Sequence, residues 1–459
     1  MSNFRVEQDS LGTLNVPKDA LYGAQTQRAI DNFPISGQLM PTHFIRALLM
    51  AKKAAALANG QLNRIPVDMS KAITDAVDTL LSEDLMQHFP VDVFQTGSGT
   101  STNMNANEVL ASLASQYCQQ EVHPNDHVNY GQSSNDIIPS TIHISAAITL
   151  TQNLLPALRH LISVTQDKVM QVEHHVKMGR THLMDAMPIT LGQSLQTWVE
   201  QIKQNIAQLE HLQPSIQSLA QGGTAVGTGI NTDKQFITLF YQALSANTGI
   251  TFTPANNFFT HISSQDIAVS LSGQLKATAV SMMKIANDLR WMNSGPMAGL
   301  GEIELEALQP GSSIMPGKVN PVIPEAAAMV AAQVIGNDTA ITIAGQSGNF
   351  ELNVMLPLIA KNLIESIELL SNTSTLLADK AIASFKVNTK ILAQSVSKNP
   401  MLITALNPII GYKKAADIAQ LAYKQQRPII DVATEQTELS REELEKLLDP
   451  IKLTLGGIQ

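Results

Sequence analysis

Apolar residues recur every three or four positions over long stretches of the chain, a pattern typical of helices with one buried face. One such stretch begins at Leu191 and predicts a helix of about six turns that ends at Pro214. Its apolar positions are Leu195, Trp198, Ile202, Ile206, Leu209 and Leu212. Two shorter stripes have the same spacing: Leu150, Leu154, Leu158 and Leu161, then Ile359, Leu363, Ile367 and Leu370. Because long helices of this kind usually pack as bundles, the pattern predicts a mostly α-helical protein with a central long-helix bundle.

The rest of the pattern is less regular. Ser440 with Glu443 forms a capping box, and Pro450 stops the helix that follows, so the C-terminal segment is expected to hold short helices. The region Ser10 to Val16 is one of few strand candidates. Aromatic residues make up only 4% of the chain, which favours packed helices over sheets.

Composition and charge restrict the function classes. The chain has 459 residues, of which 44% are apolar, so a disordered chain is excluded. Cys118 is the single cysteine, which excludes an intrachain disulfide and a multi-cysteine metal site. The net charge of −9 argues against nucleic-acid binding but still allows a small anionic substrate in a local cationic pocket. No uncharged apolar run reaches the ~20 residues of a membrane span, and the N-terminus lacks an apolar signal core. A cytoplasmic protein is therefore expected.

Three polar stretches rich in Gly, Ser, Thr and Asn interrupt the helical pattern: Thr96–Asn107, His123–Asn135 and Gly311–Glu325. Such stretches are usually loops, and polar loops between rigid helices are where sites tend to be built. Their small residues also leave backbone N–H groups free to bind anions. These stretches are therefore the expected location of the chemistry.

The stretch Gly311–Glu325 is not a phosphate-binding P-loop, because Gly311 and Gly317 enclose five residues and Val319 follows Lys318. Two interpretations remain, a flexible linker and a mobile flap that binds an anion and carries catalytic groups. In the second, Lys318 supplies charge, Asn320 an amide donor, and Ser312 and Ser313 hydroxyl groups. Composition alone does not separate the two.

Each of the other motifs also allows both a structural and a functional interpretation. Thr96–Glu108 and Gln132–Asp136 fit ordinary capped helix starts, and the same hydroxyl and N–H groups would also cradle a carboxylate. His182 precedes the Leu191 helix, and Glu325 is a possible partner that spacing alone does not place beside it. His123–Asp126 reads as a turn, and it lacks the second histidine of a metal site.

Together these motifs resemble the fumarase/aspartase superfamily, and within it the class II fumarate hydratases, along nearly the whole chain. The superfamily signature G-S-S-x-x-P-x-K-x-N stands at Gly311–Asn320. The subfamily resemblance rests on other stretches: Gly23–Arg28, Ser98–Val109, His123–Asp126, Gln132–Asp136, Gly179–His182 and Ala405–Ala416. It implies reversible hydration of fumarate to L-malate through an aci-carboxylate, a step of the tricarboxylic acid cycle, without metal or cofactor.

The resemblance also implies residue roles. Ser312 falls on the catalytic base, and His182, oriented by Glu325, on the second acid/base group. The positions that correspond to substrate-binding residues are Ser98, Gly99, Thr100, Ser133, Ser134, Asn135, Thr181, Ser313, Lys318, Val319 and Asn320. A second, non-catalytic dicarboxylate site corresponds to His123, Pro124, Asn125 and Asp126. That second site is in doubt, because Gln120 stands where an arginine is frequent and His127 where an aspartate is common.

The same resemblance implies three domains, an N-terminal lyase domain (1–132), a central helical bundle (133–389) and a small helical C-terminal domain (390–459). It further implies a homotetramer whose core is the bundle and whose active sites take loops from three chains. No nucleic-acid or membrane partner is expected. Two other functions remain open: an ammonia-lyase acting on aspartate, and a non-catalytic helical scaffold protein.

Overall fold

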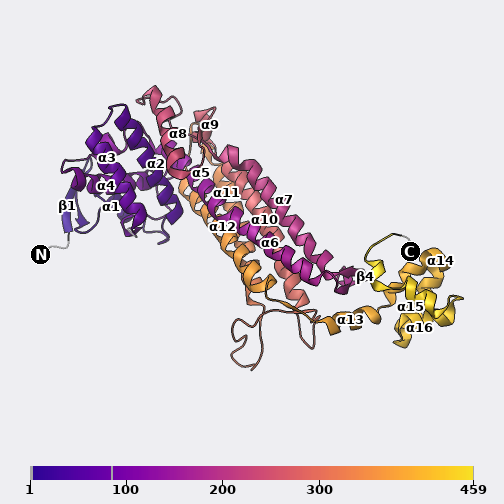
Figure 1. Cartoon of the computed structure of the whole chain (residues 1–459). Coiled ribbons are helices and arrows are strands. Elements are labelled where there is room, and N and C mark those ends of the chain that lie inside the picture. Colours follow the sequence, from indigo (N-terminus) through magenta and orange to yellow (C-terminus); the bar gives the residue numbers. More distant parts are fainter. Residues whose placement is uncertain (1–3, 84–85, 458–459) are drawn as a thin grey trace. The chain divides into compact units, whose positions relative to one another are not determined.

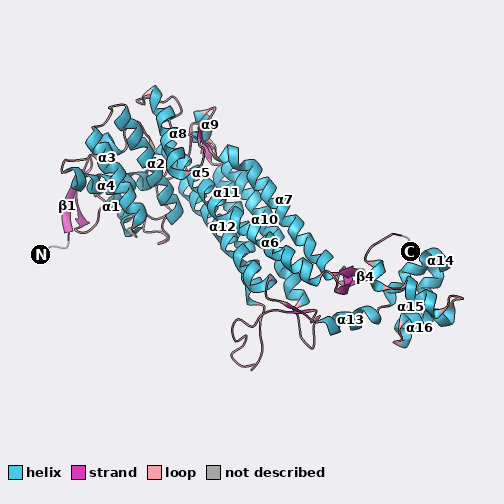
Figure 2. Cartoon of the chain, in the orientation of Figure 1, coloured by secondary structure: helices cyan, strands magenta, loops and turns pink. Residues whose placement is uncertain are grey.

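A computed structural model describes residues 4–83 and 86–457, and most of this chain is helical (Figures 1 and 2). The prediction of a mostly α-helical fold is confirmed. Within the described residues, strands pair only two by two, in five small sheets. The chain forms two compact units. Unit 1 comprises residues 1–156, 205–279 and 330–371, and unit 2 comprises residues 157–204, 280–329 and 372–459.

Unit 1 begins with an antiparallel hairpin of β1 (Phe4–Asp9) and β2 (Gly12–Pro17), in which Phe4 pairs with Pro17. The strand expected over Ser10 to Val16 is wrong at its start, because Ser10 and Leu11 form the turn. The Asp9 carboxylate accepts the Leu11 N–H at 2.9 Å, and Gly12 has φ +116°, which together bend the chain there.

Unit 1 is otherwise helical, and its core is α2 (Thr42–Gln61), an alanine-rich helix that packs against α3, α5 and α8. Its other helices are α1 (Ala24–Asn32), α3 (Val67–Ser82), η1 (Met86–His88), α4 (Thr100–Cys118), η2 (Pro124–Val128), α5 (Ser134–Thr149), η3 (Leu150–Leu154), α8 (Lys234–Thr248) and α9 (Phe258–Ser263). Its short strands are β5 (Ser218–Leu219), β6 (Thr253–Pro254), β8 (Gly348–Asn349) and β9 (Leu352–Asn353).

Unit 2 contains α6 (Leu155–Val172), the hairpin of β3 (Val176–Thr181) and β4 (Met184–Thr190), and β7 (Ile303–Glu304) paired with β10 (Lys386–Val387). Its C-terminal part is a run of short helices: η4 (Ala378–Ile382), α13 (Thr389–Ser397), η5 (Pro400–Leu406), α14 (Asn407–Ile410), α15 (Tyr412–Gln425), α16 (Ile429–Gln436), α17 (Arg441–Leu447) and α18 (Pro450–Leu453). These helices enclose a hydrophobic cluster between Leu402 and Leu448. The capping box of Ser440 and Glu443 starts α17, as the sequence predicts. The division into three domains stays a prediction.

Besides the first two residues of α6, which belong to unit 1, these long helices contribute residues to both units: α7 (Leu191–Ile216), α10 (Asp266–Met292), α11 (Val322–Gly345) and α12 (Leu356–Leu377). Within unit 1, Lys276 of α10 pairs with Asp338 of α11 at 2.6 Å, and Asn337 of α11 donates to Ser366 of α12 at 3.1 Å. The predicted stripes are buried as expected, except for the partly buried Leu212. Pro214 lies inside α7, two residues before its end, so the predicted stop was slightly early.

The polar stretches differ in part from the predicted loops. Helix α4 begins at Thr100, so only Thr96–Gly99 is loop in the first stretch. Pro124–Val128 is a short π-helical turn, with Ser133 at the start of α5. The third stretch is irregular to Pro321, after which α11 begins. Helix α11 is also the one helix in the described ranges whose length and hydropathy would allow it to cross a membrane, but it carries Glu325 and Asp338 and is weak evidence for that.

Candidate functional site

Unit 1 places two polar helix starts side by side. At the first, Gly99 has φ +72° before α4, and the hydroxyl groups of Ser98 and Thr100 are 2.8 Å apart. At the second, Ser133 caps α5 in a capping box with Asp136. The amide nitrogen of Asn103, on the first turn of α4, donates to Ser134 Oγ at 3.2 Å and so links the two starts. The free N–H groups at the starts of both helices make this region suited to bind carboxylates. Ser98–Thr100 and Ser133–Asn135 are together called the carboxylate cradle.

The buried carboxylate of Asp136 holds the start of α5 in place. Asp136 accepts the Ser133 N–H at 2.9 Å through one oxygen, and through the other it accepts Gln221 Nε2 and the N–H groups of Gly222 and Thr224 at 2.9 to 3.1 Å. Burial raises the pKa of Asp136 to about 6, although these hydrogen bonds oppose the shift. On the exposed side, Asn135 Nδ2 donates to the carbonyl of Ala225 at 2.8 Å.

The polar network beneath this cradle was not predicted from the sequence. Asn129 Oδ1 accepts hydrogen bonds from Asn103, Asn107 and the ammonium group of Lys52, at 3.0 to 3.2 Å. Lys52 is fully buried on α2. Lys52 itself was the signal in the sequence that could have indicated this network. It lies in the alanine-rich stretch of α2, and a charged residue on a buried face usually has a specific partner.

In unit 2 the segment from Gly311 to Pro321 is a closed loop, and Glu325 follows it on the first turn of α11. The Gly311 N–H donates to the carbonyl of Lys318 at 2.8 Å, and Asn320 Nδ2 donates to the carbonyl of Gly311 at 2.7 Å. A Cβ atom on Gly311 would lie 2.4 Å from the Lys318 carbonyl, so only glycine allows this closure. Inside the loop, Ser312 Oγ accepts the N–H groups of Ile314 and Met315 at 3.3 and 3.0 Å. Donors in this arrangement stabilise negative charge on the serine oxygen.

The end of this loop opens onto a cavity of about 380 Å³. It is lined by Lys318, Val319, Asn320, Pro321 and Glu325, by Asn287, Arg290 and Trp291 of α10, and by Asn293, Ser294 and Gly295, which follow that helix. The loop therefore brings together four of the predicted residues. Arg290, a second cation at this cavity, was not predicted from the sequence.

His182 lies at the tip of the β3–β4 hairpin, which the sequence analysis did not predict. His182 and Leu183 both have positive φ, 56° and 60°, as the two central residues of a tight hairpin turn. Gly179 sits at an irregularity in the register, and Arg180 and Lys177 both pair with the buried carboxylate of Glu302, at 2.8 and 2.5 Å. These contacts hold the hairpin, so that Thr181 and His182 project from it exposed to solvent.

The three predicted catalytic residues do not meet within the described part of one chain. No hydrogen bond or ion pair joins His182 to Glu325, or either of them to Ser312, among these residues. Ser98–Thr100 and Ser133–Asn135 belong to unit 1, whereas Thr181, His182 and the Gly311–Glu325 loop belong to unit 2. The predicted roles of these residues stay predictions.

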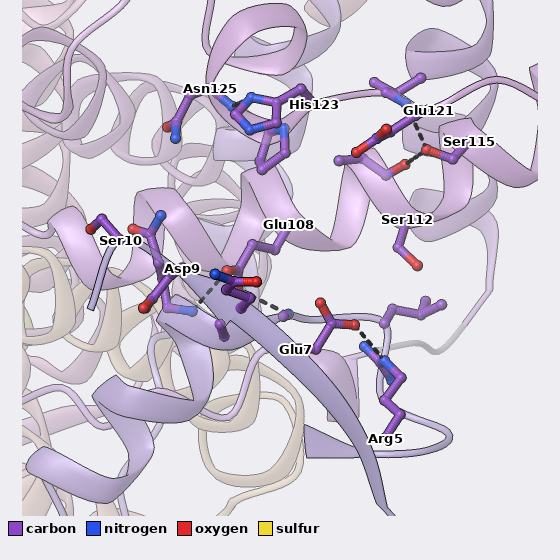
Figure 3. Close-up of a pocket in the computed structure, with 18 residues that line it drawn as sticks. Arg5, Glu7, Asp9, Ser10, Glu108, Ser112, Ser115, Glu121, His123 and Asn125 are labelled. Carbon is purple, nitrogen blue, oxygen red and sulfur yellow. Dashed lines mark hydrogen bonds and ion pairs between the residues drawn. The ribbon is translucent and has the colours of Figure 1, made fainter. Parts of the chain in front are cut away.

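The predicted second dicarboxylate site borders a cavity of about 480 Å³ in unit 1 (Figure 3). His123 Nδ1 accepts the N–H groups of Asn125 and Asp126 at 3.3 and 3.2 Å, which makes it the cap of the η2 turn. The charged groups that line the cavity are Glu7, Asp9, Glu108, Glu121 and Arg5. Arg5 pairs with Glu7 and Arg28 pairs with Asp9 at 2.7 Å, so Glu108 and Glu121 are the lining carboxylates whose charge disfavours the binding of a dianion.

The neighbouring hydrogen-bond donors are already engaged. Arg5 pairs with Glu7 at 2.7 Å and donates to backbone carbonyls, including that of Tyr22. Gln120, where an arginine is frequent in the resembled family, donates to Asp68 at 2.8 Å. Across the described residues, no group of three or more His, Cys, Asp and Glu side chains is arranged to hold a metal ion.

Comparisons with known proteins find relatives of this chain along its whole length. A model of the lyase family matches residues 12–336, and a model of the fumarase C C-terminus matches residues 402–455. The chain is 66% identical over the full length of both proteins to "Fumarate hydratase class II 2" of Pseudomonas aeruginosa, and 44% identical over 98% of both to a class II fumarate hydratase of Thermus thermophilus. The crystal structure of a class II fumarase from Schistosoma mansoni superposes with a TM-score of 0.95, at 39% identity, over 98% of this chain and 99% of that one.

Proposed function

The chain belongs to the lyase family that includes the class II fumarate hydratases, and we propose that it catalyses the reversible hydration of fumarate to L-malate. The observation that carries this proposal is the likeness to named class II fumarate hydratases along the entire chain. The same likeness makes it a hydro-lyase and not a helical scaffold protein, and Ser312 and Lys318 are both retained.

The chemistry assigned to each group follows from the dehydration direction. The Ser312 alkoxide removes a proton from the carbon next to one malate carboxylate, and the electron pair moves into that carboxylate to give an aci-carboxylate. The C–O bond at the neighbouring carbon then breaks, and the leaving hydroxide takes a proton from His182, which Glu325 orients. The electron pair returns to form the double bond of fumarate.

The contacts around Ser312 support this assignment. A serine hydroxyl is a weak base until its alkoxide is stabilised, and the N–H groups of Ile314 and Met315 are placed for that task. Lys318 and Asn320 would stabilise the additional charge of the aci-carboxylate. The helix starts with Ser98, Gly99, Thr100, Ser133, Ser134 and Asn135 would bind the carboxylates, together with Thr181, Ser313 and Val319 of unit 2.

We propose further that the enzyme is a homotetramer with shared active sites. The surface of a single chain supports this: Val280 of α10 and Met329 and Ile343 of α11 are 52 to 68% exposed, and Leu183 and Met184 at the hairpin tip are 65 and 70% exposed. Exposed apolar side chains in such number mark contact surfaces for other chains. A tetramer would have a mass of about 198 kDa, four times the 49.5 kDa of one chain. Light scattering that gives a monomer mass would contradict this.

An assay with two substrates tests the activity. Purified protein is incubated with L-malate and, separately, with L-aspartate, while the ultraviolet absorbance of fumarate is recorded. We expect fumarate from malate alone. Fumarate from aspartate alone would instead make the protein an ammonia-lyase, and no product from either substrate would leave the scaffold interpretation.

A mixing experiment tests the shared site. Ser312→Ala and His182→Asn chains, each inactive alone, are co-expressed with different affinity tags, and tetramers that carry both tags are isolated. If Ser312 and His182 of one site come from different chains, about one site in four of a random mixture regains both groups. If both groups come from the same chain, the mixed tetramers stay inactive.

We also place the enzyme in the cytoplasm. The relatives reported above include bacterial class II fumarate hydratases. Helix α11 is long and apolar enough to cross a membrane, but contacts between chains in the proposed tetramer would cover its exposed side. Fractionation of the cells that produce the protein should find the activity in the soluble fraction, and activity that sediments with the membranes would refute this.

A further inference from the structure

Lys52 is an unusual residue in the core of unit 1. It lies on α2 with 0% of its surface exposed, in a helix that has six alanines and three leucines among its 20 residues. Lysine is rarely buried to this degree unless a carboxylate pairs with it. Its ammonium group instead donates to two amide oxygens, Asn129 Oδ1 at 3.0 Å and Gln132 Oε1 at 2.9 Å.

These two amides connect Lys52 to the serines of the second helix start. Asn129 Oδ1 also accepts from Asn103 Nδ2 at 3.2 Å, and Asn103 Nδ2 donates in turn to Ser134 Oγ at 3.2 Å. Gln132 directly precedes Ser133 and is held by the carbonyl of Val128 at 3.0 Å. Lys52 thus sets the orientation of both amides that support this cradle.

The direction of the hydrogen bonds matters for ligand binding. The ammonium of Lys52 forces Asn129 to present its oxygen, which in turn orients the amide nitrogen of Asn103 toward Ser134 Oγ. Because Ser134 Oγ already accepts a hydrogen bond, its own O–H is free to donate to a carboxylate. Through this network, the positive charge of Lys52 orients the Ser134 hydroxyl so that it can donate a hydrogen bond to a bound carboxylate.

We propose that Lys52 is a positioning residue for dicarboxylate binding: it orients the Ser133–Ser134 cradle through Asn129 and Gln132, and it supplies a buried positive charge that the bound dianion compensates. This inference rests on the proposed function. It concerns a residue that contacts the cradle only through other side chains.

The charged groups around α2 define how this residue responds to pH. From α5, Asp136 is the carboxylate whose charge acts on Lys52. From α3 and from the start of α8, Asp78 and Asp233 pair with Lys53 and Arg64 in exposed ion pairs. Helix α4 contributes the amides of Asn103 and Asn107, and η2 contributes His127, whose Nδ1 accepts the His123 N–H.

Burial lowers the pKa of Lys52 to about 7, partly opposed by Asp136. Binding of a dianion favours the protonated form, so affinity should be greatest below this pKa and should fall as the pH rises through it. Dianion binding should correspondingly draw a proton from solution near pH 7.5.

The test compares Lys52→Met with Lys53→Met. Both remove one lysine charge from α2, but Lys53 lies at the surface with Asp78. We expect Lys52→Met to raise KM for fumarate about tenfold at pH 6, with a smaller loss of kcat, and to abolish the rise in KM between pH 6 and 8. Lys53→Met should retain both the KM and its pH dependence. A folded Lys52→Met protein with the KM profile of the unmodified enzyme would overturn the proposal.

A second measurement does not depend on the folding of that variant. In His182→Asn protein, which lacks the imidazole assigned to the site, binding of the unreactive dicarboxylate succinate is followed by calorimetry at pH 7.5, above the pKa of about 6 of Asp136, in buffers of different ionisation enthalpy. We expect proton uptake on binding, and binding without uptake would refute a role for the Lys52 charge. Failure of the proposed function is a different result, since it would appear as an unmodified enzyme that does not interconvert fumarate and malate.

Discussion

The hydroxyl oxygen of Ser312 accepts the backbone N–H of Met315 at 3.0 Å, inside a loop that is closed by its own backbone. The position of Met315 relative to Ser312 depends on this closure, in which Gly311 and Lys318 share a hydrogen bond of 2.8 Å. The loop thus holds donors on the serine oxygen before any ligand arrives, so the geometry of Gly311 should control the basicity of Ser312.

Gly311→Ala should therefore lower kcat/KM by about a hundredfold, because the new Cβ would lie 2.4 Å from the Lys318 carbonyl and open the loop. Gly317→Ala is the matched comparison: it lies in the same loop with φ +80°, and its Cβ would meet no atom within 4 Å. Gly317→Ala should cost only backbone strain of about 1 kcal/mol, so kcat/KM should fall less than tenfold. Steady-state kinetics of both variants measure kcat/KM. Equal losses of kcat/KM in the two variants would show that closure of the loop does not control the activity of Ser312.

His182→Asn tests the imidazole without disturbing the hairpin. Asparagine tolerates the positive φ that His182 adopts, so the turn should form while turnover falls by about 10² to 10⁴. His182→Val removes the same group but places a β-branched residue at that φ, so it should also lose about 1–2 kcal/mol of the free energy of unfolding. Turnover and urea denaturation separate the two effects. An Asn variant with normal turnover would remove His182 from the mechanism.

The sequence predicted the long helices well, because their periodicity is a local property that tertiary packing did not change. Trp198 and Leu363 are buried where the stripes place them. The hairpin around His182 was missed, since its strands carry an irregularity at Gly179 and its turn uses His182 and Leu183 where a hairpin of this type usually has Asn-Gly.

The site residues were predicted from motifs, whereas the groups that support them were not. Lys52 contacts Asn129 and Gln132, which lie 77 and 80 residues farther along the chain, and no local pattern reports such a contact. Glu302, which holds Arg180 of the hairpin, is likewise 122 residues away from it. Motif residues can be recognised one segment at a time, but the residues that orient them depend on how distant segments pack.

His143 should make stability depend on pH. Burial lowers its pKa to about 4 from an ordinary value near 6.5, and its Nδ1–H donates to the carbonyl of Ser218 at 2.8 Å. The unfolded chain therefore takes up a proton below about pH 6.5 and the folded chain only below about pH 4, so stability falls as the pH drops through this window.

His143→Gln isolates this contribution, which would otherwise be masked by Asp136. The raised pKa of Asp136 acts in the opposite direction below pH 6, but it is common to both proteins. The unmodified enzyme should be the more stable at pH 7, and its advantage should shrink by about 2 kcal/mol at pH 5. Urea denaturation at one protein concentration measures both values. A difference between the two proteins that does not change with pH would show that His143 is not held neutral.

The cavity beside His123 gives the last prediction. The resemblance predicts a second dicarboxylate site there, yet four carboxylates line it, those of Glu7, Asp9, Glu108 and Glu121, and only Glu7 and Asp9 are paired, with Arg5 and Arg28, among the described ion pairs. The remaining negative charge repels a dianion, so we expect calorimetric titration with succinate to find one bound molecule per chain. His123→Ala should leave this stoichiometry unchanged and kcat/KM within about twofold, since this histidine caps a turn and lies outside the cradle.

Glu121→Lys is the complementary variant, because it replaces one carboxylate of the cavity wall by a cation and adds two positive charges to its balance. If the acidic lining is what excludes the ligand, this variant should gain a weak second binding event that the unmodified enzyme lacks, and the gain should diminish with added salt. Two bound molecules per chain in the unmodified enzyme, reduced to one by His123→Ala, would instead establish the second site in spite of the acidic lining. The titration thus decides whether this chain has the second dicarboxylate site that the family resemblance predicts, or whether the carboxylates of the cavity exclude the ligand.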